Sequence, residues 1–414
     1  MNQPVLRVLE QHAEEAGFLA GLRDYAVRAP HYDLKHLRTL DSRIEAHLDG
    51  LLIAGLKGLD LLLKALSPHA TGEVFAATAL AFMAGNGPAL SSLAEHLRKA
   101  PDGERGFTSA LGWLEWATVE PWIERLLASP EPLFRRMGLA ACGMHRRDPG
   151  PALLAGLAHS DPGVLARAAR TAGELRRRDL MPAIRAHRLH DDMAVHFWAN
   201  WATVQMGDEE ALGPLRLLAE HPGPFRLRAL GVLLCWQPRE ASIQWLRALM
   251  GDPRHHRLVI QATGPFGDPV AVPWLIQRMH ELPLARAAGE AFTLITGADL
   301  ADLDLERRQV PDYDAGPTDD PEDPNVDMDP DTDLPWPDPA RVEAWWQVNR
   351  PRFANGTAYL LGEPLSEARC LAVLQSGYQR QRVAAANALA RFVPTRHVFP
   401  TSAPALRQRQ LLGC

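Results

Sequence analysis

Four regularly spaced arginines are the residues in this chain whose type and pattern point most directly to binding chemistry. Arg185, Arg216, Arg247 and Arg278 follow one another at intervals of 31, 31 and 31 residues. A guanidinium group is a planar fork of N–H donors that can hold a carboxylate through two parallel hydrogen bonds. On equivalent helices of a repeat, these side chains would form an arginine ladder that binds the acidic side chains of a partner protein. The alternative interpretation is four ordinary solvated arginines.

Histidine pairs are the candidates for metal chemistry, because imidazole nitrogens are common ligands of transition metals. His187 and His190 lie three residues apart, but a metal site needs ligands that converge from several elements. One hydroxylase family built from helical repeats binds iron through repeated His–Glu pairs, and here only His280 and Glu281 have that order. The sequence therefore predicts no catalytic residues, no metal ion and no other cofactor.

One acidic stretch resembles the first half of a calcium-binding loop. Asp323, Asn325, Asp327 and Asp329 alternate with other residues, as the ligands of such a loop do. However, Met328 stands where the loop needs a glycine, and no glutamate occupies the twelfth position. We expect a solvated acidic linker here and not a specific calcium site.

An internal repeat of about 30 residues supplies the elements that would position the arginine ladder. Its anchors are Pro132, Pro162, Asp192, Pro222, Pro253 and Pro283, with steps of 30, 30, 30, 31 and 30 residues. Proline at the first position of a helix sacrifices no hydrogen bond, so each anchor predicts a helix start. Small residues recur eleven positions later, as at Gly143, Gly173 and Gly264, and would let neighbouring helices approach closely. A second helix follows each first one, so each unit is a helical hairpin that buries its apolar faces only by stacking.

These features predict an all-α fold, namely a short-period HEAT-like α-solenoid with an N-terminal helical cap and a small C-terminal helical module. Over roughly residues 120–298 the repeat resembles the short HEAT-like repeats of phycobilin lyases, which implies a fold and not lyase activity. Residues 71–100 and 101–129 read as two degenerate units. Residues 4–66 read as two amphipathic cap helices, the second with Asp33 as its N-cap.

Composition divides the rest of the chain. Residues 298–340 hold 15 acidic residues against 2 arginines, and prolines punctuate them, so we expect an irregular or unstructured linker there. Residues 341–414 hold 10 arginines against 3 glutamates. The predicted domains are residues 1–70 (cap), 71–298 (repeat solenoid), 299–338 (acidic linker) and 339–414 (C-terminal module).

Charge and cysteine usage limit the partners. A net charge of −6 argues against bulk attraction to nucleic acid or to an anionic membrane. A HEAT-like DNA glycosylase would need a strongly basic face, whereas residues 120–297 carry only 21 arginines against 18 acidic residues. No segment has the length of apolar sequence that a membrane span requires, and residues 1–16 lack the apolar run of a signal peptide. Four scattered cysteines without a CxxC pair fit the reducing cytoplasm.

Several motifs together give the chain a family resemblance. They are Leu40-Asp-Ser-Arg-Ile-Glu-Ala-His-Leu-Asp-Gly-Leu, Asp319-Asp-Pro-Glu-Asp, Leu334-Pro-Trp-Pro-Asp-Pro with Trp345-Trp346, and Tyr359-Leu-Leu-Gly. With them the chain resembles, from end to end, a family of uncharacterised bacterial HEAT-repeat proteins often encoded beside type VI secretion genes. The resemblance implies a cytoplasmic accessory role, such as an adaptor or chaperone for a secreted effector, and supplies no catalytic residues.

The sequence thus favours a non-enzymatic scaffold that binds another protein through the concave face of the solenoid. An immunity protein that neutralises a toxin is the alternative binding role, and a HEAT-like enzyme acting on nucleic acid or protein is the alternative of another class. The acidic segment is a second possible ligand of the arginine ladder, through intramolecular docking, because a net charge of −13 directly follows the arginine-bearing repeats.

Overall fold

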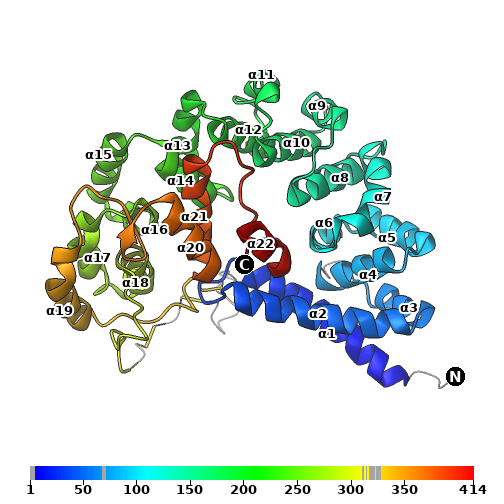
Figure 1. Ribbon diagram of the computed structural model, residues 1–414, viewed down its shortest axis with the longest axis horizontal. Helices are drawn as coiled ribbons and strands as arrows, with labels where there is room; N and C mark the ends of the chain where they lie inside the picture. Colours follow the sequence, from blue (N-terminus) through cyan, green and yellow to red (C-terminus); the bar gives the residue numbers. More distant parts are fainter. Residues whose placement is uncertain (1–4, 68–70, 310–311, 314, 317–321, 323–327) are drawn as a thin grey trace. The chain divides into compact units, whose positions relative to one another are not determined.

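Helices provide nearly all the regular structure in the computed structural model, which describes residues 5–67, 71–309, 312–313, 315–316, 322 and 328–414 (Figure 1). Within these residues the only strands are β1 (Tyr359–Leu360) and β2 (Glu363–Pro364), which form one antiparallel hairpin. The predicted all-α fold class is confirmed.

The contacts within the chain define two compact units. Unit 1 comprises Met1–Arg28, Tyr32–Ala211 and Pro394–Cys414, and unit 2 comprises Ala29–His31 and Leu212–Val393. The C-terminal 21 residues therefore belong to the same unit as the N-terminal repeats. The predicted domain boundaries at residues 70, 298 and 338 stay a prediction.

Unit 1 begins with three helices where the sequence predicted two: α1 (Leu6–Ala26), α2 (Leu34–Ile53) and α3 (Leu56–Lys64). The extra break lies at Gly55, whose φ of +61° is readily adopted only by glycine. The predicted N-cap is confirmed, because an Asp33 carboxylate oxygen accepts a 2.7 Å hydrogen bond from the His36 amide.

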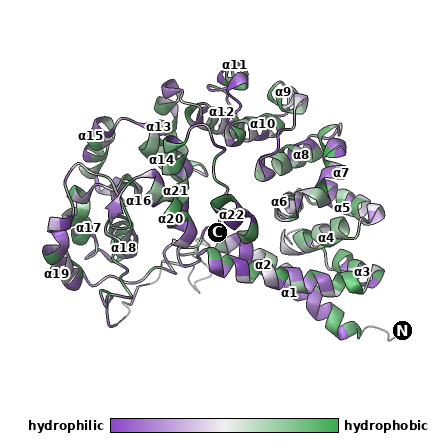
Figure 2. Cartoon of the chain, viewed as in Figure 1, coloured by the Kyte–Doolittle hydropathy of each residue, from purple (hydrophilic) through white to green (hydrophobic). Residues whose placement is uncertain are grey.

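The repeats of unit 1 are pairs of helices in which each first helix packs against the next first helix. The first helices are α4 (Thr71–Met83), α6 (Glu104–Trp113), α8 (Pro132–His145), α10 (Pro162–Leu175) and α12 (Met193–Gln205). The second helices are α5 (Gly87–Lys99), α7 (Trp116–Leu127), α9 (Pro151–Leu157) and α11 (Met181–Arg185), which lie along one side of that row (Figure 1). Hydrophobic and hydrophilic residues alternate along these helices, as expected where each helix buries one side (Figure 2).

The repeat anchors mark helix starts with one exception. Pro132 and Pro162 are the first residues of α8 and α10, and Asp192 caps α12 by accepting bonds from two backbone amides. Pro253 opens a 3₁₀ turn before its helix. Pro222 is the exception, since the next α-helix begins four residues later, at Arg226.

The recurring small residues sit where successive first helices touch. A Cβ atom added to Gly173 on α10 would lie 2.8 Å from the Cα atom of Ala202 on α12. One added to Gly264 in unit 2 would lie 3.1 Å from the Cα atom of Ala291. These positions bring one backbone against the next, which is the close approach that the spacing predicted.

Unit 2 continues the helical pairs and adds a C-terminal module. Its helices are α13 (Leu212–Glu220), α14 (Arg226–Trp236), α15 (Arg239–Met250), α16 (His256–Phe266), α17 (Val272–Arg278), α18 (Leu282–Thr296), α19 (Pro339–Asn349), α20 (Glu367–Ser376) and α21 (Gln379–Phe392). The β1–β2 hairpin joins the module to the repeats. The Tyr359 amide donates to the Gly267 carbonyl after α16, and the Leu361 amide donates to the Leu294 carbonyl of α18.

Replacing Gly173 by alanine tests the packing of the first helices. We expect Gly173→Ala to lower the free energy of unfolding by about 1–3 kcal/mol, because the new methyl group meets the α12 backbone and the helices must separate. Gly21→Ala is the matched control, since a Cβ there has no neighbour within 4 Å and alanine should stabilise α1 by about 0.5–1 kcal/mol. Urea denaturation followed by circular dichroism measures both. Equal stability of the two variants would contradict the packing account.

Candidate functional site

The C-terminal segment of unit 1 lies on the ends of the first helices. We call the residues that hold it the C-terminal docking face: Asp41 of α2, Gly112 and Leu114 at the end of α6, Arg146 after α8, and Glu174 of α10. The segment ends in α22 (Ala405–Leu412), which packs on α2 and lies on the opposite side of the first helices from α5, α7, α9 and α11 (Figure 1). Within unit 1 the hydrogen bonds from this face to the segment therefore come from α2 and from the C-terminal ends of first helices.

Asp41 is the buried anchor of this face, with its residue 0% exposed. One carboxylate oxygen accepts bonds from Arg23 Nε at 2.5 Å and from Trp113 Nε1 at 3.0 Å. The other accepts a 2.7 Å bond from the Ala405 amide, at the start of α22. A buried carboxylate is stable only when such donors compensate its lost hydration. Asp41 therefore ties the start of α22 to α1, α2 and α6.

Residues 394–403, which precede α22, form a second attachment that uses main-chain atoms. We call these residues the strap. The Val398 carbonyl accepts bonds from Arg146 Nε at 2.9 Å and Arg146 Nη2 at 2.6 Å. The Val398 amide donates at 3.1 Å to the carbonyl of Glu174. The repeats thus hold the strap through its backbone, which carries no sequence information.

Arginines outnumber carboxylates where the strap is held. The Glu174 carboxylate lies 3.0 Å from Arg167, 2.8 Å from Arg170 and 3.7 Å from Arg146. Burial alone would raise the pKa of Glu174, but these three charges outweigh it and lower the pKa to about 2. Burial lowers the pKa of Arg167 to about 10, still far above neutrality. The cluster keeps an excess of positive charge at pH 7.

The C-terminal segment adds a further positive charge to this face, that of Arg407. Arg407 of α22 donates to the Gly112 carbonyl at 2.8 Å and the Leu114 carbonyl at 2.7 Å. Burial, and then the charge of Arg407, lower the pKa of His145 to about 4, although its ring bonds the Leu111 carbonyl at 2.8 Å. Partial burial and the charges of Arg146 and Arg176 likewise lower the pKa of His397 in the strap.

In unit 2 the C-terminal part of the acidic segment, residues 328–338, docks on repeat helices. Asp329 pairs with Arg286 of α18, and Asp331 pairs with Arg257 of α16 at 2.7 Å. The Arg286 guanidinium also lies over the Trp336 ring, 4.4 Å from its centroid. The segment is irregular there, as predicted, but it is held by specific contacts.

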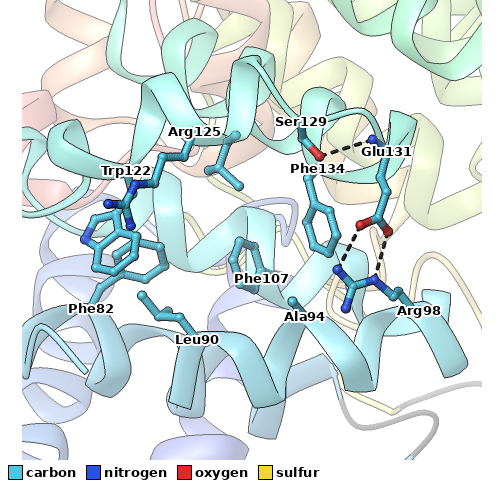
Figure 3. Close-up of a pocket in the computed structure, with 11 residues that line it drawn as sticks. Phe82, Leu90, Ala94, Arg98, Phe107, Trp122, Arg125, Ser129, Glu131 and Phe134 are labelled. Carbon is cyan, nitrogen blue, oxygen red and sulfur yellow. Dashed lines mark hydrogen bonds and ion pairs between the residues drawn. The ribbon is translucent and has the colours of Figure 1, made fainter. Parts of the chain in front are cut away.

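A cavity of about 220 Å³ opens between the helical pairs of unit 1 (Figure 3). Phe82, Phe107, Trp122 and Phe134 give it an aromatic lining. At one edge Arg98 holds both oxygens of Glu131, at 2.9 and 2.8 Å, and at the opposite edge Arg125 lies over the Trp122 ring (Figure 3). Other edge residues include Ser129, whose hydroxyl accepts a bond from the Glu131 amide. The cavity is suited to an apolar group and has no nucleophile–base pair in its lining.

The ladder arginines have varied surroundings. Arg185 Nε bonds Asp208 at 2.8 Å, Arg216 bonds the Gln237 side chain at 2.5 Å, and Arg278 pairs with Glu281 at 2.5 Å. Arg247 is exposed on α15. All four lie on second helices, Arg185 in unit 1 and the other three in unit 2. Their role in binding a partner stays a prediction.

Other sequence candidates have local explanations or lie outside the described residues. His190 Nδ1 accepts a 2.9 Å bond from the Asp192 amide, beside the cap of α12. In the described part of the chain, no group of three or more His, Cys, Asp or Glu side chains could hold a metal ion. Asp323, Asn325 and Asp327 of the calcium-like pattern lie outside the described residues. Of the helices in the described ranges, none has both the length and the apolarity needed to cross a membrane.

The sequence prediction missed the C-terminal docking face. Asp41 and Ala405 are separated by 364 residues, so no local pattern links them. The one available signal was Asp41 itself, an acidic residue at an apolar position of α2, within a motif that carries the family resemblance.

Comparison with known families supports the architecture. A family described as HEAT repeats matches residues 150–233, which run from the start of α9 into α14. Together with the helical pairs, this match supports a HEAT-like α-solenoid fold. Neither a curated protein nor a solved structure matches the chain.

Removing the Glu174 charge tests the buried cluster. We expect Glu174→Gln to lower the free energy of unfolding by about 3 kcal/mol, because it leaves buried arginines without their carboxylate. Glu131→Gln is the control: it removes an equally close arginine pair that is solvent-exposed, and should change stability only marginally. Urea denaturation of the full chain, followed by fluorescence, separates the two. A marginal loss for Glu174→Gln would refute the buried-cluster account.

The lowered pKa of His145 predicts that the folded protein loses stability in acid. Its folded-state pKa of about 4 lies below the usual 6.5, so the neutral ring contributes stability above pH 6.5 that is lost as the pH falls toward 4. Between pH 7.5 and pH 5 this loss should reach about 2 kcal/mol. His145→Gln keeps a donor for the Leu111 carbonyl and should remove that part of the pH dependence. Stability curves of the two proteins that run parallel across this range would sink the assignment.

Proposed function

We propose that this chain is a non-enzymatic scaffold or adaptor that binds another protein. The supporting observation is that repeat helices in both units hold irregular segments of the chain itself, by arginine–carbonyl bonds in unit 1 and arginine–carboxylate pairs in unit 2. A surface that holds extended segments in this way is suited to a partner's segments too. Similarity to HEAT repeats agrees with this role, because such repeats commonly serve as interaction scaffolds.

The family resemblance suggests the setting. We place the protein in the bacterial cytoplasm, with a type VI secretion effector as its partner and with loading or stabilisation of that effector as its task. The arginine ladder is the proposed contact for acidic side chains of the partner, and Arg185 and Arg247 are its exposed members. No residue is assigned a catalytic role.

Affinity purification from the native host, followed by mass spectrometry, tests the function. We expect a neighbouring gene product to be captured, and expect recovery to fall at least about fivefold when Arg185, Arg216, Arg247 and Arg278 are replaced by glutamine, because charge-assisted bonds are lost. The control replaces exposed arginines elsewhere, Arg7, Arg43, Arg125 and Arg308, by glutamine. Equal recovery from both quadruple variants would contradict the ladder, and capture of no specific protein would contradict the scaffold.

Co-expression separates the two binding roles. An adaptor should raise the amount or secretion of the captured protein. Protection of cells from that protein's toxicity would instead identify an immunity protein.

A further inference from the structure

The contacts that hold the strap in unit 1 show which features another peptide segment would need in order to bind in its place. It is held by two main-chain groups of Val398, whose side chain is buried, and by the Ser402 carbonyl, which accepts a 3.3 Å bond from Arg23 Nη2. Main-chain recognition of this kind accepts any extended segment with a small apolar residue at that point. Side-chain charge then decides which segment is preferred.

The charge of the strap is poorly matched to its surroundings. The strap contains one arginine, one histidine and no acidic residue. Arg146 bonds the strap at the Val398 carbonyl, and the charges of Arg146 and Arg176 act on His397. Arg146, Arg167 and Arg170 share the single carboxylate of Glu174. Arg396 is exposed, and burial together with the charges of Arg146 and Arg176 lowers the pKa of His397, so its ring is neutral at pH 7. The strap therefore offers no negative charge to the arginines beneath it.

We propose that the surface beneath the strap, formed by Arg146, Arg176 and the Glu174 carbonyl, is the binding site for an extended acidic segment of the partner protein. The strap occupies the site until such a segment displaces it. Helix α22 stays docked, because Asp41 and the Arg407 contacts hold it independently of the strap. This inference rests on the proposed scaffold function and names the chemistry of the partner.

Two labelled peptides test the charge argument on the full chain. One has the sequence of residues 394–403, and the other carries the changes Arg396→Glu and His397→Glu. We expect the acidic peptide to bind at least about tenfold more tightly in fluorescence anisotropy, because it brings two carboxylates to a surface with an excess of arginines. We also expect this difference to shrink as salt is raised. Equal affinity of the two peptides overturns the proposal.

The same two substitutions within the chain give the competition test. A chain with Arg396→Glu and His397→Glu holds its own strap better, so its affinity for the acidic peptide should fall at least about tenfold relative to the wild type. Both positions are exposed, so the fold is not at risk. Arg409→Glu is the matched control, since Arg409 is exposed on α22 outside the strap, and it should leave peptide affinity unchanged. An unchanged affinity of the double variant overturns the proposal.

Other results separate this inference from the scaffold function. If the wild-type chain captures a partner but binds neither peptide, the site is refuted and the scaffold stands. If the acidic peptide binds while no partner is captured, the site stands and the scaffold role is refuted. Light scattering that reveals a dimer dependent on residues 394–403 would make a second copy the occupant and would overturn the proposal.

Discussion

The structure depends on one packing constraint: a pair of short helices cannot bury its own apolar faces, so every pair needs its neighbours. The contact between successive first helices satisfies this need. At Gly173 there is no room for a methyl group between α10 and α12, and Gly143 is enclosed by Arg167, Thr171 and Glu174. Because the first helices approach so closely, their ends form one surface within unit 1. The C-terminal segment lies on that surface.

Arginine is the residue that attaches irregular segments to this helical framework. Helix ends expose carbonyl groups, and an irregular segment brings further carbonyls that no helix can satisfy. Arg146 and Arg407 supply donors to these carbonyls from opposite sides, one from the repeats and one from α22. In unit 2, Arg257 and Arg286 meet carboxylates instead. The basic side chains of the repeats are thus suited to hold both backbone and acidic side chains, which is the basis for proposing a protein partner.

Sequence reasoning recovered what is local and periodic. The starts of α8 and α10 and the N-cap at Asp33 follow from nearby residues. It did not recover the contacts that join segments distant in the sequence. The motifs behind the family resemblance are such joints: Asp41 holds α22, Trp336 packs under Arg286, and Tyr359 bonds the end of α16. Repeat spacing also does not reveal which helix of a pair meets a docked segment, so an arginine ladder was predicted on second helices while first helices hold the strap.

The central claim is that the repeat helices of unit 1 hold the C-terminal segment in a defined position. Hydrogen exchange of the full chain at neutral pH tests it most directly, because the Val398 and Ala405 amides donate to the Glu174 carbonyl and the Asp41 carboxylate. The account predicts strong protection at Ala405, comparable to that of α8 and α10, and intermediate protection at Val398. Exchange of both amides at the rate of an unstructured peptide would contradict it.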